Sequence, residues 1–369
     1  MQPTRAIIHL DNLRRNILAA REKAGPHPKI CFPVKADAYG HGAVSISRYA
    51  LEAGVEYLAV SGFSEGAELR AAGIGAPVLL LSQTLPEDLP EIASQELIPF
   101  VSDEEYIEEA ARAAKRLGKK LTVHLKVDTG MGRLGCPPEE AATLAGKIAS
   151  SPGLSLGGIA THLSVADSTA PDHIAYTKEQ LRRFREALDA VRKAGIDPGI
   201  VHAANSGALV FHGDSYFDMV RPGIFLYGYP PPGAQLELPV EPVMELQSKV
   251  VLIRKLKAGA TASYGNTWTA AGDTFVGVIP CGYADGLPRG FSNNHSALIR
   301  GKTYPAIGTI CMDQFMVNLG PATEVKRWDE AVIFGPGFIT AADMAEKLNT
   351  IPYEITCNIH KRVPREYVG

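Results

Sequence analysis

Residues 97–128 read LIPFVSDEEYIEEAARAAKRLGKKLTVHLKVD, and this stretch decides the fold. It opens with an apolar run, Leu97–Val101, continues with a segment of helical period, and returns to an apolar run at Leu121–Asp128. Short apolar runs on either side of an amphipathic helix are typical of buried parallel strands joined by a crossover. The stretch therefore predicts a strand–helix–strand unit.

The central segment carries helix boundary signals of its own. We predict a helix over Asp103–Leu117, with Ser102 and Glu105 forming a capping box at its start. Gly118 supplies the residue that commonly ends a helix. A second helix is predicted over His173–Lys193, before Gly195.

The same alternation extends over about the first 230 residues. Eight strands are predicted, at Lys29–Lys35, Tyr57–Ser61, Pro77–Ser82, Leu97–Val101, Leu121–Asp128, Leu156–His162, Ile200–Asn205 and Asp218–Ile224. Eight strand–helix units favour an α/β fold in which the strands close into a (β/α)8 TIM-like barrel. An open doubly wound sheet is the alternative.

The pattern changes after the proline-rich segment 229–233. Glycine-punctuated, β-branched runs follow and predict strands at Ser248–Leu256, Thr274–Cys281, His295–Arg300 and Gln314–Leu319. A short helix is predicted over Ala341–Leu348. We expect a barrel domain over 1–235 and a mainly β C-terminal domain over 236–369.

Composition excludes several classes of protein. A net charge of −3 and a pI of about 6.4 give no basic field for nucleic acid. We find no signal-peptide core and no apolar run of membrane-spanning length, so we expect a soluble, cytoplasmic protein without a membrane partner. Five scattered cysteines without a C-x-x-C pair suit reduced packing residues, and no metal site is predicted.

Lys35 is the first candidate for chemistry. It follows the apolar run 30–34 and precedes the glycines of Tyr39-Gly40-His41-Gly42. Partial burial lowers the pKa of a lysine and frees a nucleophilic amine, which forms a Schiff base with an aldehyde cofactor. Taken alone, a strand-ending lysine more often reaches into water.

His124, Lys126 and Asp128 form a polar stripe on one face of a predicted buried strand. If this face points inward, Lys126 must be paired, neutralised or chemically modified, because an unpaired buried charge costs several kcal/mol. A solvated strand end is the alternative for Asp128.

Further polar residues follow the last three barrel strands. His162 and His202 lie at or near strand ends, Asn205-Ser206-Gly207 offers an anion cradle, and Arg221 precedes the glycine of Arg221-Pro222-Gly223. Barrels often bind phosphate in the loops after strands seven and eight. A phosphate-binding site beside a reactive amine suggests pyridoxal 5'-phosphate as the cofactor.

Nine short motifs occur in order along nearly the whole chain: VKADAYGHG, HLKVDTGMGRLG, THLSVAD, HAANSG, VRPGIFLYG, SYGNTW, GYADG, ICMDQ and RVPR. In these motifs and their order the chain resembles the alanine racemase family, pyridoxal-phosphate enzymes built from a barrel and a β-domain. The order of nine motifs is far more specific than any one of them.

The resemblance implies roles for the barrel residues. Lys35 would carry the Schiff base and act as one catalytic base, and Arg221, supported by His202, would face the pyridine nitrogen. His162 would lie against the cofactor ring, and Arg133 would bind the phenolic oxygen and the substrate. Lys126 corresponds to a lysine that is often carbamylated. The phosphate contacts would come from Tyr39, Asn205, Ser206, Gly223 and Ile224.

The resemblance also implies a homodimer with shared active sites. Racemisation needs proton-transfer groups on both faces of the α-carbon. Tyr264 occupies the position of the second base, which family members bring from a partner subunit. Tyr283, Met312 and Asp313 would contact the substrate from the same side. The implied reaction is racemisation of L-alanine to D-alanine, which supplies peptidoglycan.

Two departures from the family pattern leave substrate choice open. Thr309 stands where several members carry arginine, and Lys361 stands where many carry tyrosine. A racemase of serine, lysine or arginine, or one of broad specificity, is the nearest alternative. A non-enzymatic carrier of pyridoxal phosphate and a barrel metallohydrolase using carbamylated Lys126 with two histidines are more distant ones.

Overall fold

The computed structural model describes residues 3–369, which divide into two compact units. The barrel unit comprises Arg14–Ala38 and Ala43–Val240, and the β unit comprises the rest. This division differs from the expected 1–235 barrel domain at the N-terminus, because the first strand, β1 (Arg5–His9), belongs to the β unit. Its pairing partner β10 (Met244–Lys249) lies far away in the chain, so no local pattern signals the pairing.

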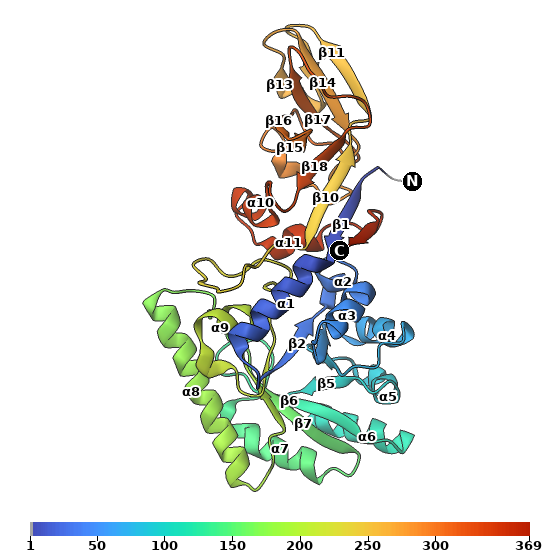
Figure 1. The fold of residues 1–369 in the computed structure, drawn as a ribbon. Helices are drawn as coiled ribbons and strands as arrows, with labels where there is room; N and C mark the ends of the chain where they lie inside the picture. Colours follow the sequence, from blue (N-terminus) through green and yellow to red (C-terminus); the bar gives the residue numbers. More distant parts are fainter. Residues whose placement is uncertain (1–2) are drawn as a thin grey trace. The chain divides into compact units, whose positions relative to one another are not determined.

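Eight parallel strands form the barrel unit (Figure 1). In chain order they are β2 (Lys29–Pro33), β3 (Tyr57–Val60), β4 (Val78–Leu80), β5 (Ile98–Val101), β6 (Leu121–Lys126), β7 (Leu154–Ala160), β8 (Ile200–His202) and β9 (Met219–Val220). Each of the eight predicted strands is present.

The sheet runs β8-β7-β6-β5-β4-β3-β2-β9, so β8 and β9 are its two ends. Hydrogen bonds join these ends: the N–H of Asp218 donates to the Val201 carbonyl at 3.0 Å, and that of Arg221 to the Ala204 carbonyl at 2.8 Å. The barrel is therefore nearly closed, which confirms the (β/α)8 prediction over the open doubly wound sheet.

Helices alternate with the strands and surround them (Figure 1). They are α1 (Leu10–Ala24), α2 (Lys35–Tyr39), α3 (Ala43–Glu52), α4 (Phe63–Ala71), α5 (Leu89–Ser94), α6 (Glu104–Leu117), α7 (Ala141–Ser150), α8 (Pro171–Lys193) and α9 (Ser206–Phe211). No helix among residues 3–369 is long and apolar enough to cross a membrane.

The predicted capping box of α6 was wrong by one residue. Asp103 is the N-cap, and its carboxylate accepts a hydrogen bond from the Tyr106 N–H at 2.8 Å. The Ser102 hydroxyl instead donates to the Gln83 side chain at 2.7 Å. Ser and Asp are equally good caps, so two adjacent candidates cannot be separated by residue type alone. Gly118 ends the helix in a left-handed conformation, as predicted.

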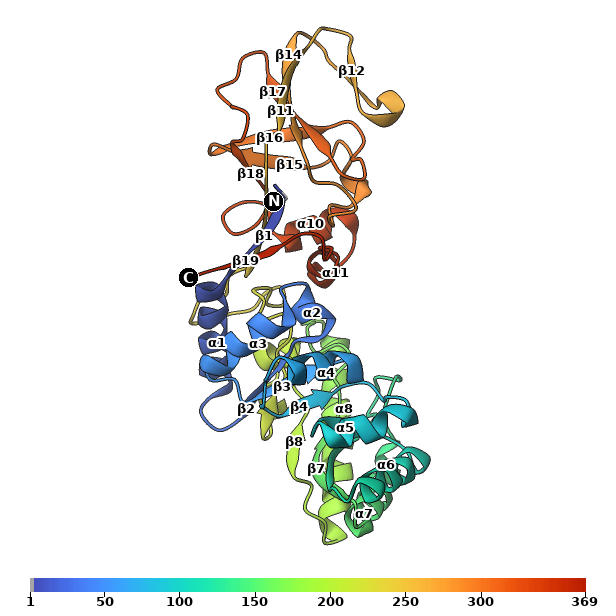
Figure 2. The same ribbon diagram turned by 90° about the vertical axis from the view of Figure 1, so that its right-hand side faces the viewer.

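The β unit contains a mainly antiparallel sheet with the order β11-β14-β17-β16-β15-β18-β10-β1-β19 (Figure 2). Its remaining strands are β11 (Leu252–Leu256), β14 (Thr274–Ile279), β15 (Ser296–Ile299), β16 (Lys302–Ile307), β17 (Phe315–Gly320), β18 (Glu330–Phe334) and β19 (Arg365–Val368). The single predicted strand Ser248–Leu256 is in fact the end of β10 and all of β11, which pair with different neighbours.

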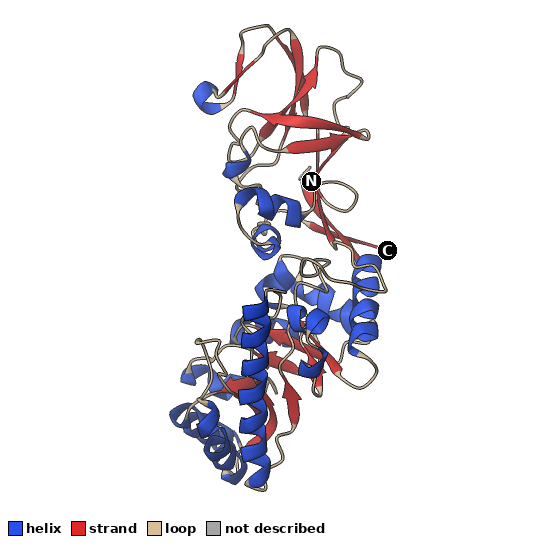
Figure 3. Cartoon of the chain, turned by 90° about the vertical axis from the view of Figure 1, so that its left-hand side faces the viewer, coloured by secondary structure: helices blue, strands red, loops and turns tan. Residues whose placement is uncertain are grey.

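Two helices and a separate hairpin complete the β unit. The helix α10 (Ala341–Leu348) has the predicted bounds and begins with a capping box between Thr340 and Asp343, and α11 (Pro352–Cys357) follows it. The hairpin of β12 (Thr261–Ala262) and β13 (Trp268–Thr269) stands out from the sheet (Figure 2). Its tip is a short helical turn, seen in blue in Figure 3.

Candidate active site

Lys35 lies at the start of a left-handed turn that follows β2. Ala36, Asp37 and Ala38 have φ angles of 51°, 54° and 53°, and Tyr39 continues the turn at 53°. L-residues in this conformation cost about 1–2 kcal/mol each, so a run of four is rare unless the surroundings impose it. Such strain is typical of functional sites.

Two carboxylates hold this turn. Glu65 accepts hydrogen bonds from the Ala36 N–H at 2.7 Å and from the Ser61 N–H at 2.6 Å. Asp37 accepts one from the Ala43 N–H at 2.8 Å. The half-buried Lys35 is thereby fixed at the carboxyl end of β2. Glu65 was not predicted, because nothing in its local sequence distinguishes it from a surface residue of α4.

Four cationic side chains surround His162 just beyond the end of β7. The pKa of His162 is held well below its usual value by burial and then by the positive charges of Arg221, Lys126, Arg133 and Lys35. These five residues come from the carboxyl ends of four barrel strands. The structure therefore brings together side chains that the sequence predicted one by one, in a site that favours an anion.

Arg221 is 6% exposed and held by hydrogen bonds on both terminal nitrogens. One terminal nitrogen donates to the carbonyls of Thr161 and Ala203, at 2.9 and 3.1 Å, and lies 3.4 Å from His162 Nδ1. The other lies 2.8 Å from His202 Nδ1. Burial lowers the pKa of Arg221 to about 10, so it stays charged at neutral pH. Its Nε has no hydrogen bond to residues 3–369 and is available to a bound group.

An anion cradle lies in the loops after β8 and β9. Four buried backbone N–H groups, of Ser206, Gly207, Gly223 and Ile224, have no acceptor among the described residues. The two loops are joined because the Phe225 N–H donates to the Ser206 hydroxyl at 3.3 Å. Buried N–H groups are rarely left without a partner, so this cluster fits a phosphate.

Asn205 builds one side of this cradle. Its side-chain oxygen caps α9 by accepting from the Ala208 N–H at 3.0 Å, and its amide donates to the Leu163 carbonyl at 3.0 Å. A Cβ on Gly207 would lie 2.5 Å from the backbone nitrogen of Asp167. Only glycine fits there, because the loop after β7 passes directly over the start of α9.

Lys126 is buried with very few polar contacts. Its amine reaches only the Val127 carbonyl, at 3.4 Å, within the described part of the chain. Burial and the charge of Arg221 lower the pKa of Lys126 to about 7, although Asp128 opposes the shift. A large share of the amine is therefore neutral and nucleophilic near neutral pH.

The loop that carries Arg133 folds around the Asp128 carboxylate. This carboxylate accepts from the N–H groups of Gly130, Met131 and Arg133 at 2.9, 2.8 and 3.0 Å. Burial alone would raise the pKa of Asp128, but these backbone hydrogen bonds outweigh it and the net shift is downward. The third member of the predicted polar stripe is thus a loop-forming residue.

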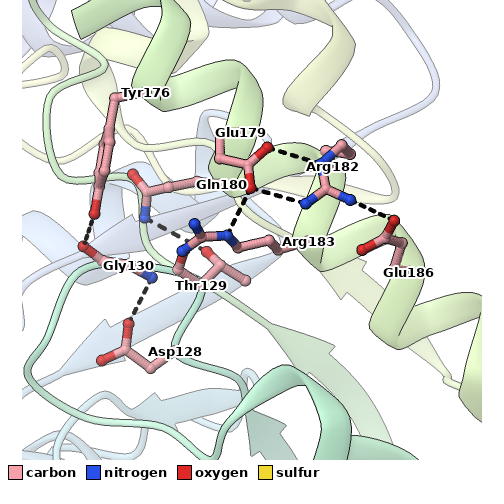
Figure 4. Close-up of polar contacts among 9 residues, drawn as sticks. All are labelled: Asp128, Thr129, Gly130, Tyr176, Glu179, Gln180, Arg182, Arg183 and Glu186. Atoms are coloured by element: carbon pink, nitrogen blue, oxygen red, sulfur yellow. Dashed lines mark hydrogen bonds and ion pairs between the residues drawn. The ribbon is translucent and has the colours of Figure 1, made fainter.

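Helix α8 binds the same loop from outside (Figure 4). The Tyr176 hydroxyl donates to the Gly130 carbonyl at 2.7 Å, and Arg183 donates to the Thr129 carbonyl at 3.3 Å. Glu179 orients Arg183 through a 2.8 Å ion pair. An open cleft of about 710 Å³ lies beside these contacts.

Gln180 of α8 links two loops of the site. Its amide donates to the His162 carbonyl at 3.1 Å. The same amide lies 3.4 Å from the Thr129 hydroxyl (Figure 4). Its oxygen accepts from the Ser164 N–H and hydroxyl, at 3.0 and 3.1 Å. The side chain is buried, so the loops after β6 and β7 share one fixed amide. Gln180 was not among the residues predicted from the sequence.

In the β unit, Tyr264 lies in the turn at the tip of the β12–β13 hairpin and is 72% exposed. The preceding Ser263 has a φ of 66°, a strained value for a serine. Its hydroxyl donates to the Thr309 carbonyl at 2.5 Å, and the Thr309 hydroxyl donates to the Tyr264 carbonyl at 2.8 Å. Thr309, noted above only as a departure from the family pattern, therefore holds the backbone of the Tyr264 turn.

Three other predicted substrate contacts lie in one part of the β unit. Tyr283 and Met312 are 44% and 52% exposed. Arg362 donates to Asp285 at 2.8 Å and to Asp313 at 2.8 Å. Because Asp285 is buried, it anchors Arg362, which in turn fixes the Asp313 carboxylate.

Tyr39 packs against a tyrosine that sequence analysis missed. The rings of Tyr39 and Tyr353 are 5.5 Å apart between centroids, and both residues belong to the β unit. Tyr353 directly follows Pro352, which opens α11, and this local pattern alone does not predict a contact with Tyr39. Lys361, the other departure from the family pattern, is exposed.

Both halves of the chain match proteins of known family. Residues 8–231 match the family description "Alanine racemase, N-terminal domain", and residues 243–367 match "Alanine racemase, C-terminal domain". An alanine racemase of Treponema denticola is 48% identical over 100% of this chain and 99% of its own length.

Solved structures agree with these matches. An alanine racemase of Clostridium difficile superposes with a TM-score of 0.94 at 37% identity, covering 100% of this chain and 96% of that one. A structure of alanine racemase from the same organism in complex with cycloserine gives 0.93 at 35% identity, over 100% and 96% of the two chains.

Fold, site and comparisons together define an amino-acid racemase, which is an isomerase. Within that class the chain belongs to the alanine racemase family, as both halves of its sequence and its full-length relatives show.

Proposed function

We propose that this chain racemises L-alanine and D-alanine with pyridoxal 5'-phosphate as its cofactor, in the cytoplasm, and so supplies D-alanine for peptidoglycan. The observation that carries the proposal is the convergence of Lys35, Lys126, Arg133 and Arg221 around His162, beside four unpaired backbone N–H groups. A cofactor with an anionic phosphate and an aldehyde matches a site that combines N–H donors, cations and an amine.

Residues of the site are available for each chemical group of the cofactor. The N–H groups of Ser206, Gly223 and Ile224, with the Asn205 side chain and Tyr39, would hold the phosphate. Arg221 would offer its unused Nε to the pyridine nitrogen, His162 would lie against the ring, and Arg133 would bind the phenolic oxygen. When bound, the cofactor supplies an aldehyde for covalent attachment and a conjugated ring that stabilises negative charge at the α-carbon.

Arg221 has a second consequence for the reaction. It is already cationic and cannot accept a proton at neutral pH, so it would keep the pyridine nitrogen unprotonated. That limits how much negative charge the ring withdraws. We infer that the site favours rapid return of the proton over side reactions.

Two bases would then exchange the proton. Lys35 would act on one face of the α-carbon, and Tyr264 of the partner subunit on the other. The exposure of Tyr264, Tyr283 and Met312 in the single chain supports a homodimer in which these side chains complete the partner's site. Met312, Tyr283 and the fixed Asp313 would line the substrate side, together with Arg133.

Lys126 would carry a carbamate. Its pKa of about 7 provides the neutral amine that reacts with carbon dioxide. The neutral amine adds to carbon dioxide and releases one proton, so an anionic carbamate would take the place of the amine and hold the Arg133 guanidinium. Carbon-13 NMR with labelled bicarbonate tests this step, because a carbamate resonance should be present in the native protein and absent from a Lys126→Met variant.

The deciding experiment combines cofactor chemistry with turnover. Purified protein saturated with pyridoxal phosphate should gain a visible absorbance that borohydride abolishes, and peptide mapping should place the reduced adduct on Lys35. The same preparation, offered L-alanine, L-serine, L-lysine and L-arginine, should racemise alanine fastest. A colourless protein would contradict the proposal, and faster turnover of another amino acid would support the alternative racemase.

A further inference from the structure

A row of three hydrogen-bonded side chains crosses the inside of the barrel unit. Arg221 lies 2.8 Å from His202 Nδ1, and His202 Nε2 lies 2.9 Å from His124 Nδ1. All three are buried, with exposures of 6%, 0% and 1%. His124 is the far member of this row, and the function proposed above assigns it no role.

The chemistry of the donors determines where each proton lies. A guanidinium only donates hydrogen bonds, so His202 Nδ1 must present its lone pair to Arg221. The single proton of a neutral His202 must then be on Nε2, which donates to His124. It follows that His124 Nδ1 is the acceptor and that the proton of His124 is on Nε2.

Both histidines are neutral in the folded chain. Burial and then the charge of Arg221 lower the pKa of His124 to about 3. Burial and the same charge hold the pKa of His202 well below its usual value. Each ring therefore has one proton and one lone pair, so the order of donors along the row has only one solution.

The His124 ring occupies a space that β7 leaves open. A Cβ on Gly158 would lie 2.7 Å from His124 Nδ1 and 2.4 Å from the Ile200 carbonyl oxygen. The ring of Phe100 packs near both imidazoles, with centroids 6.3 Å from His124 and 6.0 Å from His202. The acceptor is thus held in place by packing as well as by its hydrogen bond.

We propose that His124 is a positioning residue that stabilises the Nε2–H tautomer of His202 and thereby orients the Arg221 guanidinium. One terminal nitrogen of Arg221 is fixed by backbone carbonyls, whereas the other relies on His202 alone. Without the acceptor on His124, the Nε2–H of His202 would be buried without a partner, and the tautomer that accepts from Arg221 would lose one of its two hydrogen bonds. The alternative tautomer would turn an N–H toward Arg221. The inference rests on the proposed function only in treating Arg221 as the partner of the pyridine nitrogen.

The first test reads the tautomers directly in the holoenzyme. NMR of protein labelled with ¹⁵N-histidine, assigned with His124→Asn and His202→Asn variants, should show His124 and His202 as neutral Nε2–H tautomers. Finding His202 protonated at Nδ1, or charged at pH 7, overturns the proposal. This readout does not depend on turnover, so it separates failure of the inference from failure of the proposed function.

The second test compares an acceptor with its apolar replacement. In His124→Asn the side-chain oxygen can stand in for Nδ1, whereas His124→Leu fills the space without an acceptor. We expect the leucine variant to lose about 10–100-fold in kcat with KM for alanine changed much less, and to shift the absorbance of the bound cofactor.

The asparagine variant should recover most of that loss, and His173→Asn, a partly exposed change on α8, should match the native enzyme in every readout. A leucine variant with native kcat and spectrum contradicts the proposal, as does an asparagine variant that is equally impaired. If the leucine variant does not fold, the tautomer measurement on the native holoenzyme decides alone.

Discussion

The two regions that carry the proposed bases are built in opposite ways. Both terminal nitrogens of Arg221 have hydrogen-bond partners within the same unit, and the residue is 6% exposed. Tyr264 is 72% exposed, and its hydroxyl has no hydrogen bond among residues 3–369. A group that holds a cofactor permanently gains from being fixed by its own chain. A group that completes another subunit's site must instead reach the surface, so only its backbone is fixed.

The comparison predicts the largest effect for the exposed member. Tyr264→Phe should lower kcat for alanine racemisation by about 10²–10⁴-fold, because one of two proton-transfer groups is lost. The free energy of unfolding should change by less than about 0.5 kcal/mol, as for other exposed substitutions. Steady-state kinetics and urea unfolding measure the two quantities. Tyr304→Phe, a partly exposed tyrosine of the same unit, is the matched control and should leave both unchanged.

The barrel side should respond mainly in stability. Gln180→Leu removes the buried hydrogen-bond partners of the Ser164 N–H and the His162 carbonyl. We expect the free energy of unfolding to fall by about 2–4 kcal/mol. KM for alanine should rise as well, because the loop that carries Arg133 loosens. Urea unfolding at fixed cofactor concentration measures the first effect. Glu186→Gln, an exposed change on the same helix, should stay within about 0.5 kcal/mol, and equal effects of the two would show that the buried amide is not important.

Lys126 makes the free energy of unfolding of the barrel unit depend on pH. Its folded-state pKa of about 7 lies below the unfolded value of 10.5, so between these values the unfolded chain binds a proton that the folded chain does not. Raising the pH through this window therefore favours folding, by at most about 1.4 kcal/mol per pH unit. The free energy of unfolding of the native protein and of the Lys126→Met variant should be measured in carbonate-free buffer. From pH 7 to 9 the native value should rise relative to that of the variant. A pH-independent difference would contradict the assigned environment.

The smallest effect concerns the backbone of the exposed turn. Thr309→Val removes one hydrogen bond to the Tyr264 carbonyl, worth about 1 kcal/mol, and should lower kcat by up to about 5-fold. Thr309→Ser keeps the hydroxyl and should restore most of the rate. Kinetics with both enantiomers of alanine test this, and equal rates for the valine and serine variants would count against a role for the hydroxyl.

Local patterns predicted the barrel because a parallel strand buried on both faces is a continuous apolar run. Residues 78–80, for example, are fully buried, and the sequence there is Val-Leu-Leu. The same logic failed where pairing is long-range or a run is interrupted. It missed β1 and β19, and it merged β10 with β11 because apolar Val250 and Val251 conceal the break.

The candidate site was predictable where a residue type itself carries the chemistry, as for Lys35, Arg221 and the glycine-rich cradle. It was not predictable where the role comes from geometry. Gln180 is an ordinary glutamine of an amphipathic helix until the fold buries it between two loops. His124 was visible only as part of a polar stripe, because its link to Arg221 passes through a histidine 78 positions away.

The central claim is that two different bases exchange the α-proton, one fixed in the barrel unit and one supplied by the exposed Tyr264. Proton nuclear magnetic resonance of alanine in deuterium oxide tests it most directly, with the Tyr264→Phe holoenzyme and each enantiomer in turn. We expect the variant to exchange the α-proton of one enantiomer for deuterium without inverting it, while the other enantiomer stays unlabelled. Exchange of both enantiomers at equal rates, or racemisation at the native rate, would contradict the account.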